Sequence, residues 1–103
     1  MLVEIRRYTI KPGLREEFVA WFEDQVVPAM TEAGMRILGV FTGVEDPDAF
    51  FYLRAFEDMA ERERLTQEFY GGVVWLETMR DKALAMESSY EVHLVESTSR
   101  SSI

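Results

Sequence analysis

The sequence contains no cysteine, and this absence excludes several kinds of chemistry at once. Disulfide bonds, thiolate metal ligands and a cysteine nucleophile are all ruled out. There is one histidine, His93, so no metal site in a single chain can be built from several histidines. We therefore expect neither a bound metal nor a cofactor.

Positive charge is also scarce, because 11 Lys and Arg residues stand against 19 Asp and Glu residues, a formal net charge of −8. Nucleic acids and anionic membrane surfaces are bound by basic surfaces, so neither partner is expected. No apolar run approaches the roughly 18 residues of a membrane span. The first seven residues carry charges where a signal peptide would need an unbroken apolar core. We expect a cytoplasmic protein.

What the chain does have is the composition of a folded domain. It has 103 residues, of which 48% are hydrophobic and 13% aromatic, enough for one domain with a modest core. We expect a single domain over residues 1–97. Residues 98–103 are polar and turn-prone, which is typical of a flexible C-terminal tail.

Hydrophobic spacing divides the chain into strands with a period of two and helices with a period near 3.6. Pro28 is expected to kink the first helix or to end its regular part at about Val27, and Gly34 is expected to stop it. Asp58, with Glu61 three residues on, predicts the start of a later helix. The expected elements are a strand over 2–10, a helix from 14 to about 34, strands over 35–44 and 49–57, helical segments over 58–70 and 74–86, and a strand over 89–96.

The order of these elements is β-α-β-β-α-β, with the second helix split at Gly71 and Gly72. This order is typical of a ferredoxin-like split sandwich in the α+β class, a four-stranded antiparallel sheet with helices on one face. The first and third strands are expected at its centre.

Alternation along the strand at 49–57 places Phe51, Leu53 and Ala55 on one face. We expect these apolar residues to pack against the helices. The opposite face would then be uncovered, aromatic and charged, while the facing of the strand at 35–44 stays ambiguous. The residues expected on the uncovered face are Glu4, Arg6, Tyr8, Tyr52, Arg54, Phe56, Glu91 and His93.

An uncovered face of this composition suggests a homodimer in which two sheets enclose a shared cavity. Arg6 and Arg54 would lie on neighbouring strands, where two guanidinium groups suit a carboxylate or an enolate. The alternative is a structural ion-pair network with Glu4 and Glu91, and the sequence does not decide between them.

The aromatic and imidazole side chains leave similar alternatives. Tyr8 and Tyr52 either donate hydrogen bonds to a ligand or pack across strands. His93 is a weak candidate for a general base or a haem ligand, against the alternative of a hydrogen-bonded strand histidine.

The opening segment, Glu4-Ile5-Arg6-Arg7-Tyr8-Thr9-Ile10-Lys11-Pro12-Gly13, resembles the E-L-R-x-Y-x-L-K-P-G start of NIPSNAP-family domains. Further matches to that pattern extend the resemblance over residues 2–96: Pro28, Gly34, Gly39, the Tyr52-Leu53-Arg54-Ala55-Phe56 strand, and Phe69-Tyr70 before Trp75. The resemblance implies a dimeric α+β barrel. The wider superfamily includes cofactor-independent monooxygenases, lactone isomerases, stress-response proteins and haem enzymes, so fold kinship alone names no reaction.

Three functional hypotheses follow. The leading one is a homodimeric NIPSNAP-like protein that binds a small anionic or aromatic molecule in a sheet-lined cavity. The second is a cofactor-independent monooxygenase or isomerase that uses His93 or a tyrosine for proton transfer. The third is a structural or interaction module whose own side chains fill the cavity.

Overall fold

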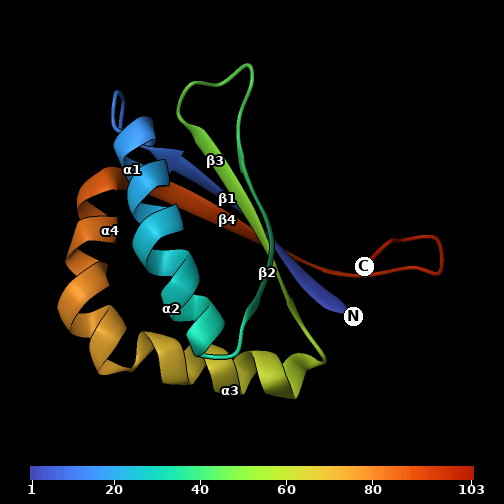
Figure 1. The fold of residues 1–103 in the computed structure, drawn as a ribbon. Helices are drawn as coiled ribbons and strands as arrows, with labels where there is room; N and C mark the ends of the chain where they lie inside the picture. The colour runs from blue at the N-terminus through green and yellow to red at the C-terminus, as the bar shows by residue number, and fades with distance from the viewer.

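A computed structural model describes all of residues 1–103, and it confirms the expected order of elements (Figure 1). Both helical regions contain a π-helical segment, η1 and η2, in addition to α-helix. The elements are β1 (Leu2–Ile10), α1 (Arg15–Trp21), η1 (Phe22–Val26), α2 (Val27–Glu32), β2 (Arg36–Thr42), β3 (Ala49–Phe56), α3 (Met59–Tyr70), η2 (Val74–Met79), α4 (Arg80–Met86) and β4 (Glu87–Glu96).

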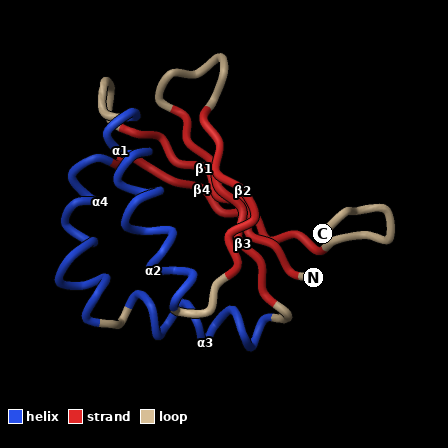
Figure 2. Tube along the Cα trace, in the orientation of Figure 1, coloured by secondary structure: helices blue, strands red, loops and turns tan.

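The four strands form one antiparallel sheet in the order β2-β3-β1-β4, so β1 and β3 are central as expected. All helices lie on one side of this sheet, which gives two layers (Figure 2). The α+β ferredoxin-like prediction is therefore confirmed. No helix has the length and apolar character needed to cross a bilayer.

Pro28 is accommodated by a change of helix type and does not end the helix. The backbone N–H of Val27 donates to the carbonyl of Phe22, five residues earlier, which is the π-helical spacing. Proline lacks an N–H and crowds the carbonyl four residues before it, so a widened turn there relieves both problems. α-Helix resumes at Val27 and runs to Glu32.

The predicted ends of two helices are confirmed by their hydrogen bonds. Gly34 has a φ of 102°, its N–H donates to Thr31, and the N–H of Met35 donates to Met30, which is a Schellman motif. At the start of α3, the Asp58 carboxylate accepts a hydrogen bond from the N–H of Glu61 at 2.8 Å.

The prediction of which sheet face the helices cover was wrong. We call the face that packs on the helices the covered face and the other the open face. The covered face carries the fully buried Phe50, Tyr52, Arg54 and Phe56, together with their neighbours on β1. Phe51, Leu53 and Ala55 lie on the open face instead. The β1 residues of the covered face are Glu4, Arg6, Tyr8 and Ile10.

Two physical causes account for this orientation. The aromatic rings of the covered face pack on α1 and η1; Phe50 lies 5.0 Å from Phe18 and 4.9 Å from Phe22 between ring centroids. The charged residues tolerate burial because they are paired with one another, since an unpaired buried charge is costly.

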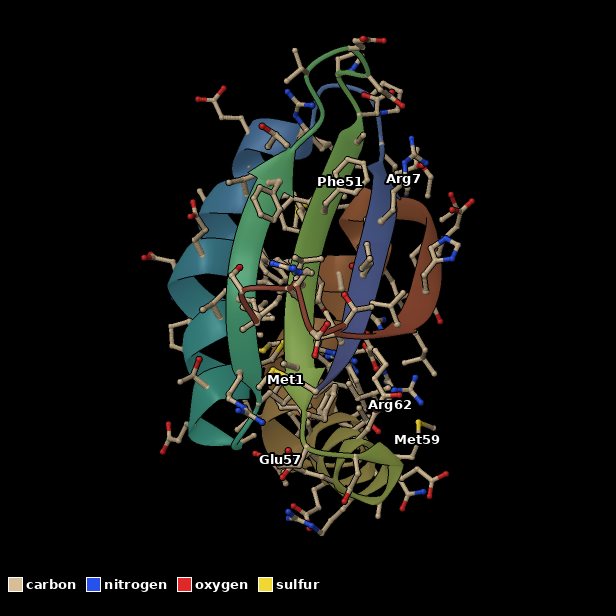
Figure 3. All side chains as sticks on the ribbon, turned by 90° about the vertical axis from the view of Figure 1, so that its right-hand side faces the viewer. Met1, Arg7, Phe51, Glu57, Met59 and Arg62 are labelled. Carbon is tan, nitrogen blue, oxygen red and sulfur yellow. The ribbon has the colours of Figure 1, made fainter.

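The open face is partly crossed by residues 97–103 (Figure 3). The segment is attached where the N–H of Ser97 donates to the carbonyl of Met1 at 3.0 Å. It borders a hollow of about 290 Å³ formed with Val3, Ile5 and Leu53 of the sheet. Arg7 and Phe51 lie side by side on the same face, with the guanidinium carbon 5.7 Å from the ring centroid.

Candidate functional site

The buried carboxylate of Glu4 is the centre of an ion cluster between the sheet and the helices. Its Oε1 accepts hydrogen bonds from Arg6 at 2.8 Å and Arg54 at 2.7 Å. Its Oε2 accepts from Nε of Arg62 on α3. Glu4 is fully buried and Arg54 nearly so, with 1% of its surface exposed.

The cluster carries more positive than negative charge. Burial by itself would raise the pKa of Glu4, but the charge of Arg54 and the hydrogen bonds from three arginines hold it below its usual value. Arginine stays protonated in proteins. Three guanidinium groups against one carboxylate leave an excess of two positive charges within a strongly acidic protein.

Three tyrosine hydroxyls surround this excess charge. Tyr8 Oη accepts from Arg6 Nε at 3.1 Å and Nη2 at 3.0 Å, and Tyr70 Oη accepts from Arg54 Nη1 at 2.8 Å. The hydroxyl of Tyr52 is buried and has no hydrogen-bond partner. Burial raises the pKa of Tyr8 and of Tyr52, so both remain O–H donors.

These groups border a pocket between the covered face and the helices. Its outer chamber has a volume of about 250 Å³ and is lined by Arg6, Tyr8, Tyr70, Trp75, Ala83, Leu84, Glu87 and Tyr90. A much smaller inner chamber, about 20 Å³, lies deeper between the sheet and η1. Four residues line both chambers: Tyr8, Tyr70, Trp75 and Glu87. We refer to the two together as the tyrosine pocket.

Aromatic rings form much of the wall of the tyrosine pocket. Tyr8 stacks on Tyr90 with centroids 5.5 Å apart, and Trp75 packs edge-on against Tyr70 at 5.0 Å. Arg6 lies 5.5 Å from the centroid of the Tyr90 ring. Flat aromatic walls beside a guanidinium group favour a planar ligand that carries negative charge.

Glu87, the first residue of β4, contributes the one carboxylate of the pocket wall. Burial raises its pKa to about 7, although the nearby Arg6 opposes this shift. The group therefore exchanges a proton near neutral pH, where an ordinary glutamate is fully ionised.

The structure brings together five of the predicted site residues and separates the other two. Glu4, Arg6, Tyr8, Tyr52 and Arg54 all lie at the ion cluster or the tyrosine pocket. The expected pairing of Glu4 with Arg6 or Arg54 is confirmed, since both pairs form.

Glu91 and His93 lie on the opposite, open face. Each side chain is 65% exposed, and they approach one another at 3.7 Å. The part of the expected ion-pair network that joined Glu91 to Arg6 and Arg54 was wrong, because both arginines lie on the covered face. The same separation places His93 outside the tyrosine pocket. No cluster of three or more potential metal-ligating side chains is present.

Sequence reasoning missed three members of the site. Arg62 was not singled out in the sequence, although it reaches Glu4 from α3. Tyr70 was noticed only as part of the family resemblance, and Glu87 was not singled out. The position of Glu87 could have drawn attention to it. α4 ends at Met86 and β4 begins at Glu87, so Glu87 lies at the junction of a helix and a strand.

Comparison with solved structures gives a consistent fold assignment. An uncharacterized NIPSNAP domain protein from Burkholderia xenovorans matches with a TM-score of 0.89 and 20% identity, covering 98% of each chain. Protein Atu4242 from Agrobacterium tumefaciens matches with a TM-score of 0.92 and 19% identity, covering 100% of this chain and 99% of its own. An antibiotic biosynthesis monooxygenase matches more distantly, with a TM-score of 0.68 and 18% identity over 95% of this chain and 99% of its own.

Curated proteins include no significant match to this sequence. The family model named NIPSNAP matches residues 3–98, nearly the whole chain. The resemblance seen in the sequence is thereby confirmed, and the chain belongs to the NIPSNAP family.

Proposed function

We propose that this protein binds a small, planar organic anion in the tyrosine pocket. The main observation in support of this proposal is that the pocket has more hydrogen-bond donors than acceptors. Arg6, Tyr8 and Tyr70 supply positive charge and hydroxyl protons, and the buried hydroxyl of Tyr52 has no partner. A ligand oxygen that accepts these hydrogen bonds would remove the cost of leaving them unmade.

The location differs from the cavity expected from the sequence. The ligand would lie between one sheet and its own helices, whereas the sequence suggested a cavity between two sheets. Other surface hollows suit such a ligand less well. The hollow between α2 and α3, about 370 Å³, is bordered by Glu32 and Glu68 and by no cationic residue.

An enzymatic role as a cofactor-independent monooxygenase or isomerase is the second candidate. One specific observation favours it, namely a carboxylate with a pKa near 7, Glu87, in the wall of the same pocket. A structural neighbour described as an antibiotic biosynthesis monooxygenase shares the fold but only 18% identity. His93 is no longer the candidate base, because it faces away from the pocket.

The proposal includes a homodimer that pairs the open faces. Arg7, Phe41 and Phe51 leave partly exposed apolar and cationic surface there, and the helices do not cover it. Residues 97–103 would have to shift or take part in the contact, since they now cross this face (Figure 3).

Ligand binding is tested with benzoate, salicylate, phenylpyruvate and succinate as probes. Thermal melting and tryptophan fluorescence report binding, the latter because Trp75 lines the pocket. We expect the aromatic anions to raise the melting temperature and succinate to do so less. A melting temperature that no probe changes would contradict the proposal.

A matched pair of variants locates the site. Leu84→Glu adds a negative charge at the pocket mouth, where the leucine is 64% exposed, and should weaken anion binding at least about tenfold without unfolding the protein. Val44→Glu makes the same charge change at a fully exposed residue remote from the pocket and should bind as the wild type does. Equal binding by both variants would place the ligand elsewhere.

A further inference from the structure

The wall of the tyrosine pocket holds a proton acceptor and a set of hydroxyl donors side by side. Glu87 lines both chambers together with Tyr8 and Tyr70, and Tyr52 lines the inner one. We infer that Glu87 removes a proton from carbon next to a carbonyl group, and that the tyrosine hydroxyls hold the enolate oxygen that forms. The substrate class is an aromatic 2-oxo acid or a related ketone with an α-hydrogen. This inference rests on the proposed function.

The hydroxyl geometry explains why the oxygen would become anionic here. Tyr8 and Tyr70 already accept hydrogen bonds from Arg6 and Arg54, so each hydroxyl proton is polarised and free to point at a ligand. Tyr52 has no other partner at all. Donors fixed in advance around a developing oxyanion stabilise the transition state more than the neutral ketone.

The step balances without any oxidant or added reactant. The C–H bond breaks and its proton passes to the Glu87 carboxylate. The bonding pair becomes the carbon–carbon double bond of the enolate, and the carbonyl π electrons move to oxygen. Return of a proton to the same carbon gives exchange, and return to another carbon gives an isomer.

The surroundings of Glu87 suit this role. The charged and titratable groups that line the pocket with it are Arg6 and Tyr8 from β1, Tyr52 from β3, Tyr70 from α3 and Tyr90 from β4. None of these side-chain types ordinarily titrates between pH 5 and 9. A carboxyl group with a pKa of about 7 passes between acid and base in that range.

The test follows deuterium incorporation at C3 of phenylpyruvate by proton NMR in D₂O, with the full chain. We expect exchange above the buffer rate, rising with pH to a plateau above about pH 7. Glu87→Gln should lower the enzymatic rate at least a hundredfold, and Tyr52→Phe about tenfold or more, with phenylpyruvate still bound. Glu96→Gln, an exposed change on the same strand, should exchange as the wild type does.

Separate outcomes distinguish the two proposals. Phenylpyruvate binding without exchange above the Glu87→Gln rate overturns the inference and leaves the binding function standing. Absence of binding by all probes overturns both. If Glu87→Gln melts well below the wild type, exchange is compared at a temperature where both proteins are folded, and an unchanged exchange rate and pH profile in Glu87→Gln there also overturns the inference.

Discussion

Glu4→Gln is the substitution that tests the ion cluster most directly, because it removes one charge and keeps nearly the same shape. In the wild type the carboxylate pairs with Arg6, Arg54 and Arg62. The amide keeps one acceptor oxygen but no charge, so two well-buried guanidinium groups would face each other without a counter-ion. Repulsion between them adds to the cost of their desolvation.

The expected loss is large for a domain of this size. Removing one partner of a buried ion pair typically costs about 3–5 kcal/mol, and small domains have only about 5–15 kcal/mol of stability in total. Each kcal/mol shifts the melting temperature by roughly 4–8 °C in domains of up to about 100 residues. We therefore expect a fall of at least about 12 °C.

Urea denaturation of the wild type, Glu4→Gln and Glu57→Gln at pH 7 measures the loss in the free energy of unfolding. Glu57 pairs with Arg36 at 3.0 Å, but its side chain is 70% exposed. An exposed pair is worth about 0–1 kcal/mol, so the control should melt almost as the wild type does. A loss below about 1 kcal/mol in Glu4→Gln would refute the view that its charge neutralises the cluster.

Acid titration tests the role of the Glu4 charge independently. The pKa of Glu4 is lowered in the folded protein, so the folded state binds fewer protons at this group than the unfolded state does. Its stabilising effect is present above the unfolded value, near 4.5, and is lost as the pH falls through the lower folded value. The stability difference between wild type and Glu4→Gln should therefore shrink at strongly acidic pH.

Three further predictions concern the core, the pocket and the open face. Trp21→Ala should lose about 3–5 kcal/mol in urea melts, because the indole is buried in the core, and a loss under 1 kcal/mol would contradict this packing. Glu87→Gln should be more stable than the wild type at pH 8 by up to about 2–3 kcal/mol, but not at pH 4. The reason is that a carboxyl group with a raised pKa destabilises the fold as the pH rises from 4.5 through 7. Equal melting of the two proteins at both pH values would disprove the raised pKa. Sedimentation equilibrium should show a wild-type dimer and a 12.0 kDa monomer for Phe51→Lys, and a monomeric wild type at micromolar concentration would argue against the dimer.

The sequence predicted which residues of β1 and β3 share a face of the sheet, but it placed Glu91 and His93 of β4 with the wrong set and assigned the helices to the wrong face. Alternation with a period of two groups Tyr52 with Arg54 and separates both from Leu53, whatever covers them. The choice of the covered face then rested on polarity alone. Polarity misled because Arg54 is neutralised by Glu4, which lies 50 residues earlier in the chain.

The site was predictable only where its residues lie on regular strands. Arg6, Tyr8, Tyr52 and Arg54 belong to two neighbouring strands, so the sequence brought them together correctly. Glu87 and Tyr70 lie at the ends of elements, and their positions depend on how the second helical region folds back over the sheet. The spacing of residues along the chain does not predict where the second helical region packs on the sheet. For this reason the pocket is evident only in the structure.

The charge distribution also constrains how the proposed anion would reach this pocket. The protein as a whole carries a net charge of −8, so an approaching anion is repelled at long range, whereas the buried cluster attracts it at short range. Salt screens exposed charges beyond about 8 Å at physiological ionic strength and affects buried ones much less. Added salt should therefore speed anion association here, the reverse of the usual effect for an anion and a cationic site. Slower association with added salt would mean that local positive charge outweighs the net charge of the protein along the path of entry, and the argument from net charge would then be wrong.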